Sequence, residues 1–204
     1  MRSLPAVLHN RPEKIPIEAE RAVLSALASG RTVALAYADC GTYGALDELC
    51  ARYGLRRLPG LHCYDVFAGA PALASMFEAE PGTYVLTDFL LASFDRSVLA
   101  ELGLDRYPEL WGDYFGHYRR LIWLAQGPDG SSPALAAQAD RVAAMFDLPL
   151  TRIETGVSRL EAALAALVAD ALSRSTSSSG PSSGVGRPWS APVLANDYWR
   201  DDHD

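Results

Sequence analysis

The chain of 204 residues has a net charge of −7 and a pI near 5.1, and 49% of its residues are apolar. That is enough for a hydrophobic core without a disulfide or a metal. An acidic chain without a block of lysine or arginine lacks the footprint of a protein that binds nucleic acid or an anionic membrane. No apolar run reaches the length of a membrane span, and the first residues lack the apolar region of a signal peptide. Three cysteines without a secretory context predict a cytoplasmic protein with reduced thiols.

The N-terminal part of the chain combines loop, helix and strand patterns. Residues 8–16 are rich in proline and polar side chains, which predicts a loop, and residues 18–29 have apolar positions at helical spacing. Residues 32–38 have the pattern of a buried strand, which ends in the turn Asp39-Cys40-Gly41. Residues 45–53 again have helical periodicity, so a helix follows the turn.

The alternation of strands and helices continues along the chain. Further strands are predicted at residues 57–61, continuing into His62-Cys63, and at residues 83–88, 120–126 and 151–156. Helices are predicted at residues 65–78 with an interruption at 69–71, at 89–103, from Trp111, at 134–146 and at 158–172. This order predicts an α/β fold with a mostly parallel sheet flanked by helices, a Rossmann-like three-layer sandwich.

The composition divides the chain into three parts. Residues 1–172 form a single α/β domain, and residues 173–188 are a Ser/Gly/Pro run that predicts a flexible linker. Residues 189–204 are an acidic, aromatic tail, which is either a docking peptide or disordered.

Two thiols and an imidazole follow the first two predicted strands. If these strands are parallel neighbours, Cys40, His62 and Cys63 reach the same sheet edge, where open α/β sheets bind their ligands. Such a donor set suits zinc or iron, an iron–sulfur centre included, although the spacing matches no standard zinc motif. Thiol chemistry without a metal and purely structural cysteines are the alternatives.

Three residues are candidates for catalysis. The N-terminus of the following helix favours a thiolate at Cys40, whereas the neighbouring Asp39 opposes it unless a cation neutralises both. Asp88, at the end of the third predicted strand, is either a general base, a cation ligand or a helix cap.

The loop His9-Asn10-Arg11 offers several hydrogen-bond donors. Arg11 could hold the carboxylate or phosphate of a small anionic molecule, with His9 and Asn10 beside it. Alternatively, Arg11 pairs with Glu13 at the surface and Asn10 forms a turn before Pro12. The sequence contains neither a GxGxxG fingerprint nor a Walker lysine, so it has no NAD or ATP motif.

Several motifs occur together and in order: Leu4-Pro5-Ala6, residues 8–15, Asp39-Cys40-Gly41, His62-Cys63-Tyr64, Pro81-Gly82-Thr83, Leu86-Thr87-Asp88-Phe89-Leu90 and Leu102-Gly103-Leu104-Asp105. With them the chain resembles the domain-of-unknown-function family 1638 of bacteria and archaea, over roughly residues 4–167. Proteins of that family often occur alongside corrinoid-dependent methyltransferases, so the resemblance implies corrinoid or methyltransferase partners. Similar proteins begin with a strand ending in Cys-Gly. This chain lacks that strand, and we expect a truncated or misassigned start.

Two hypotheses on function follow. The first is a metal- or thiolate-dependent enzyme or accessory factor in one-carbon and corrinoid methyl-transfer metabolism, with the metal or the methyl-accepting thiol at Cys40, His62 and Cys63. The second is a non-catalytic module that binds a small ligand or cofactor, or a partner subunit that docks through its C-terminal tail.

Overall fold

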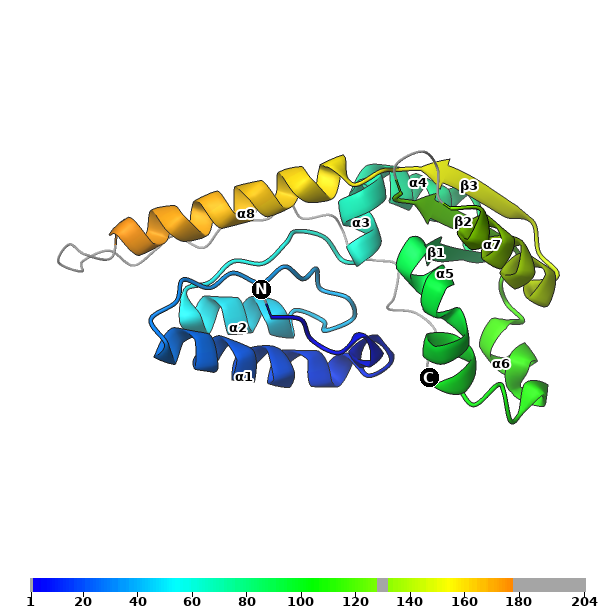
Figure 1. Cartoon of the computed structure of the whole chain (residues 1–204), viewed down its shortest axis with the longest axis horizontal. Helices are drawn as coiled ribbons and strands as arrows, with labels where there is room; N and C mark the ends of the chain where they lie inside the picture. The colour runs from blue at the N-terminus through cyan, green and yellow to red at the C-terminus, as the bar shows by residue number, and fades with distance from the viewer. Residues whose placement is uncertain (1, 128–131, 178–204) are drawn as a thin grey trace.

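The computed structural model describes residues 2–127 and 132–177 (Figure 1). Within these ranges the chain forms eight α-helices and three strands. The helices are α1 Ile15–Ala28, α2 Ala45–Tyr53, α3 Cys63–Ala68, α4 Ala70–Ala79, α5 Asp88–Phe94, α6 Trp111–Phe115, α7 Pro133–Phe146 and α8 Ser158–Ser177. None of the described helices is long and apolar enough to cross a membrane.

The three strands form one parallel sheet in the order β1-β2-β3. They comprise β1 (Thr83–Thr87), β2 (Arg120–Ala125) and β3 (Leu150–Glu154). In the register, Val85 lies opposite Ile122 on the central strand. The central strand is almost wholly buried, as expected for a parallel sheet covered on both faces.

Helices cover both faces of this sheet, because successive side chains on a strand point to opposite sides. On one face, Leu121 and Trp123 pack with apolar residues of α5, α6 and α7. On the other face, Ile122 and Leu124 pack with residues of α3 and α4. The prediction of a parallel sheet between two helical layers is therefore confirmed.

The first two predicted strands lie side by side and parallel, but they form a single isolated bridge, Leu35 to Arg57, rather than a ladder. The Leu58 amide donates to the Leu35 carbonyl, and pairing resumes where the Asp39 amide donates to Gly60. Between them, Pro59 has no N–H to donate, which interrupts the hydrogen-bond pattern. The two segments are extended but irregular, so the prediction of regular strands here was wrong.

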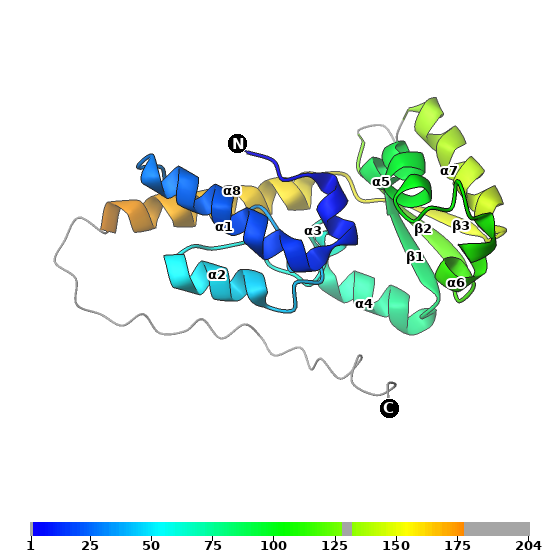
Figure 2. The ribbon, with the colours of Figure 1, turned by 90° about the horizontal axis from the view of Figure 1, so that it is seen from below.

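These two extended segments lie between helices. On one side, Leu35 packs with the core that α1 and α2 build around Ile15 and Leu46. On the other side, Leu58 packs with Leu167 of α8. Figures 1 and 2 show α8 running alongside α1 and α2 with the extended segments between them. In the N-terminal part of the chain, the two extended segments thus lie between a layer formed by α1 and α2 and a layer formed by α8.

Some element boundaries differ from the prediction. The predicted loop at 8–16 is instead formed by two 3-10 turns, Ala6–Asn10 and Pro12–Lys14, and α1 then begins at Ile15. The helix predicted at 89–103 divides into α5 and a π-helical turn, Asp95–Ala100. Helix α8 continues to Ser177 and so overlaps the start of the predicted linker; the tail at 189–204 lies outside the described residues.

Candidate metal-binding site

Three side chains from distant parts of the chain converge on one small volume. His9 belongs to the 3-10 turn Ala6–Asn10, Cys40 lies in the turn that precedes α2, and Cys63 is the first residue of α3. One ligand atom from each of the three residues lies within 4.8 Å of the others. The structure therefore unites both cysteines of the predicted site with a histidine, but this histidine is His9.

The turn that carries Cys40 is built around the buried carboxylate of Asp39. This carboxylate accepts hydrogen bonds from Thr42 Oγ1 at 2.7 Å, the Tyr43 amide at 3.0 Å and the Gly44 amide at 2.9 Å. Burial acts to raise the pKa of Asp39, but the hydrogen bonds outweigh it and hold this pKa below its usual value. Cys40 itself has φ +51°, a left-handed conformation that costs free energy and is retained because the turn fixes it.

The start of α3 is fixed to this turn by backbone contacts. The Cys40 amide donates to the Leu61 carbonyl at 2.7 Å. The Asp65 side chain in turn accepts from the amides of Leu61 and His62, at 2.8 and 3.1 Å. A Cβ atom at Gly60 would lie 2.9 Å from the Asp65 side chain, so this position needs glycine. These contacts hold Cys63 beside Cys40.

His9 is held from two directions. Its Nε2 atom lies 3.3 Å from the Tyr37 hydroxyl, and the two rings stack with centroids 5.6 Å apart. The neighbouring Asn10 donates its side-chain amide to the Ser97 carbonyl at 3.0 Å. Asn10 therefore ties the turn that carries His9 to the π-helical turn after α5.

The two thiols differ strongly in acidity. A hydrogen bond from Cys63 lowers the pKa of Cys40 to about 5, helped by His9 and opposed by burial. The same contact with Cys40, together with burial, raises the pKa of Cys63 far above its usual value. In the protein without a metal, the pair therefore holds one proton, with the negative charge on Cys40.

The three donors lie at the wall of a small cavity of about 180 Å³. Its other lining residues are apolar or aromatic: Ala36, Tyr37, Ala38, Leu58, Val66, Phe67 and Leu160. A ligand in this cavity would contact the cysteines and His9 directly.

The other residues predicted for this site lie elsewhere. His62 is exposed and is absent from the cluster; its ring lies 6.3 Å from that of Tyr64. Arg11 is also exposed and does not line the cavity. Asn10 and Asp39 have the positioning contacts described above. The catalytic and substrate-binding roles of these residues stay predictions.

Asp88 lies at the sheet, where it connects β1 to the end of β2. Its carboxylate accepts from Trp123 Nε1 at 2.8 Å and from the amides of Gln126 at 3.1 Å and Gly127 at 2.9 Å. The helix cap is Thr87, whose hydroxyl accepts from the Leu90 amide. Asp88 is not a member of the three-residue cluster, and its role as a base or ligand there stays a prediction.

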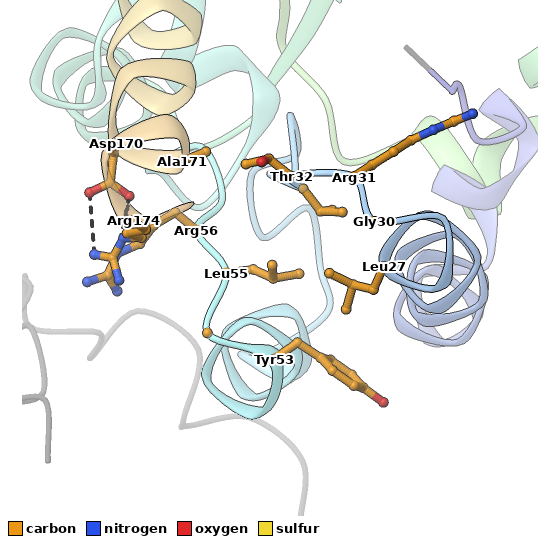
Figure 3. Close-up of a pocket in the computed structure, with 12 residues that line it drawn as sticks. Leu27, Gly30, Arg31, Thr32, Tyr53, Leu55, Arg56, Asp170, Ala171 and Arg174 are labelled. Carbon is orange, nitrogen blue, oxygen red and sulfur yellow. Dashed lines mark hydrogen bonds and ion pairs between the residues drawn. The ribbon is translucent and has the colours of Figure 1, made fainter. Parts of the chain in front are cut away.

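A larger groove, of about 410 Å³, lies between the ends of α1 and α2 and the C-terminal half of α8 (Figure 3). Leu27 and Leu55 lie in its middle, and Asp170 pairs with Arg174 at its side. None of the candidate site residues lines it.

The comparison with known protein families matches residues 3–164 to the family described as "protein of unknown function (DUF1638)". The chain belongs to the DUF1638 family. All three members of the cluster fall within the DUF1638 region, whereas Asp170 and Arg174 of the larger groove lie beyond it. No curated protein and no solved structure matches the chain.

The turn around Asp39 gives a first prediction. Replacing Asp39 by alanine removes the acceptor of three hydrogen bonds and leaves partly buried donors without a partner. We expect this to lower the free energy of unfolding by about 2–4 kcal/mol. Urea denaturation measures it, with Asp105→Ala as the control because the ion pair of Asp105 with Arg106 is exposed. Equal unfolding curves for both variants would contradict the role of Asp39 in the turn.

Proposed function

We propose that His9, Cys40 and Cys63 bind one divalent metal ion, best suited to zinc, and leave a fourth position open toward the cavity. The observation that carries this proposal is the convergence of the three donors within 4.8 Å. Around a tetrahedral zinc ion, with bonds of about 2.0–2.3 Å, neighbouring donors lie about 3.5–3.8 Å apart. The three side chains thus need only a small contraction to reach this geometry.

The acid–base properties of the pair also favour a metal. Metal ligands must be deprotonated, and Cys40 is already inclined to be a thiolate. A dication beside it would displace the proton of Cys63 and remove the cause of that group's raised pKa. Metal binding should therefore release a proton from the pair.

Three protein ligands and an open fourth position are typical of catalytic rather than structural zinc. Such a metal would keep Cys40 and Cys63 deprotonated at neutral pH and would polarise a ligand at the open position. Within this class, the proposed role is that of an enzyme or accessory factor for methyl transfer in one-carbon metabolism, since an activated thiolate is the acceptor such a transfer needs.

Metal content of the protein purified without oxygen tests the proposal. We expect one equivalent of zinc or iron per wild-type chain and almost none in Cys40→Ser and Cys63→Ser. Cys50→Ala is the matched control, because Cys50 is buried in the core of α1 and α2 and does not belong to the cluster. Equal metal content in all four proteins, or none in any, would refute the proposed site.

A second candidate function is thiolate chemistry without a metal. It is favoured by the hydrogen bond between Cys63 and Cys40, which yields a reactive thiolate at the cavity wall and does not require a metal. A metal-free wild-type protein with an acidic Cys40 would support this candidate.

A further inference from the structure

The cavity beside the three donors has an uncharged wall. Apart from His9, Cys40 and Cys63, the described side chains that line it carry one polar group, the Tyr37 hydroxyl. No aspartate, glutamate, lysine or arginine is among the described residues that line it. A ligand that enters the cavity would therefore meet no side-chain charge except those of the cluster.

The charges of the proposed centre cancel. A dication with two thiolates and a neutral imidazole has no net charge. An anion at the fourth position would make the centre negative. Because no cationic side chain is among the described residues that line the cavity, no side-chain charge there would compensate for the loss of the anion's hydration. An uncharged ligand avoids this cost.

From this balance we infer that the open position takes a small uncharged molecule, with a polar atom on the metal and an apolar body against the wall. This inference rests on the metal site proposed above and adds the chemical class of its ligand. It departs from the anionic ligand expected from Arg11, since Arg11 does not line the cavity.

The size of the cavity limits the ligand as well. Pockets that hold drug-sized ligands have volumes of about 300–1,000 Å³. A cavity of about 180 Å³ therefore suits a smaller molecule. Small alcohols, aldehydes, amides and thioethers fit this limit, whereas a nucleotide or a corrinoid does not.

A matched pair of probes tests the ligand class on the full chain loaded with cobalt, whose visible spectrum reports changes in coordination. Acetate and acetamide have nearly the same shape and differ in charge. Cobalt in water prefers the anionic acetate, so a neutral cavity should reverse the order. We expect acetamide to perturb the spectrum at lower concentration than acetate in the wild-type protein.

A charge introduced at the rim supplies the second arm of the test. Ala36 is exposed and lines the cavity, so a longer side chain is tolerated there. We expect Ala36→Lys to strengthen acetate binding by about fivefold relative to the uncharged Ala36→Gln, and to leave acetamide binding unchanged.

The outcomes separate the two proposals. Tighter binding of acetate than acetamide by the wild-type protein, with intact cobalt bands, would overturn the ligand class and leave the metal site standing. A protein that shows no cobalt–thiolate bands would overturn the metal site, and the ligand class with it.

Discussion

In the metal-free protein, alkylation of Cys40 should follow a titration with a midpoint near pH 5, where an ordinary cysteine has its midpoint above pH 8. The hydrogen bond from Cys63 is the main cause, and His9 adds to it. At pH 6 Cys40 should hold about three hundredfold more thiolate than an unperturbed thiol. The midpoint is the quantity to measure, because a thiolate of low pKa is also intrinsically less nucleophilic.

Mass spectrometry of alkylated peptides follows each cysteine separately in the same sample. Cys63→Ala removes the hydrogen-bond donor and should move the midpoint of Cys40 toward that of an ordinary thiol; His9→Ala should move it less. Cys50 is the internal control, since burial raises its pKa to about 11 and it should react slowly throughout. A midpoint of Cys40 above pH 8 in the wild-type protein would contradict the account of the pair.

Replacing Asp88 by alanine should destabilise the protein by about 3 kcal/mol without changing its metal content. The substitution leaves three donors without their acceptor: the Trp123 indole and the amides of Gln126 and Gly127. The Trp123 side chain is only 2% exposed, so water cannot replace the lost partner at the indole. A buried hydrogen-bond donor that is left without an acceptor lowers the free energy of unfolding by about 1–3 kcal/mol.

Urea denaturation gives the change in stability of Asp88→Ala, and elemental analysis gives the metal content of the same preparation. Asp88→Asn retains an acceptor oxygen and should lose less stability than Asp88→Ala. Loss of metal from a stably folded Asp88→Ala protein would show that Asp88 acts at the cluster after all. An unchanged free energy of unfolding would contradict its role in joining β1 to β2.

Much of the fold could be predicted from the sequence, because the spacing of apolar residues along the chain indicates which face of a helix or strand is buried. The apolar runs around Val85 and Ile122 predicted two strands, which the structure places side by side in the parallel sheet, and the alternation with helices predicted its two covering layers. The first two predicted strands have similar apolar patterns, yet they pair at one bridge only. Their pairing depends on backbone details such as the missing N–H of Pro59. The pattern of apolar residues alone does not reveal such details.

The site could be predicted only in part. The parallel course of two chain segments was enough to bring Cys40 and Cys63 together. The histidine was not predictable in this way, because Cys40 lies 31 positions after His9 and no spacing rule applies. His62 adjoins Cys63, but α3 begins between them and leaves His62 exposed. The signal for His9 was the motif His9-Asn10-Arg11, whose donors point equally to a small anionic ligand.

A comparison of His9 with His62 gives the most direct test of the proposed metal site. Zinc affinity is measured without oxygen by competition with a chromophoric chelator, for wild type, His9→Ala and His62→Ala. We expect His9→Ala to weaken binding by at least about a hundredfold, because loss of a ligand costs more than the 10–100-fold of an outer-shell change. His62→Ala should bind like wild type. Strong zinc binding that survives His9→Ala and is lost in His62→Ala would contradict the site described by the structure.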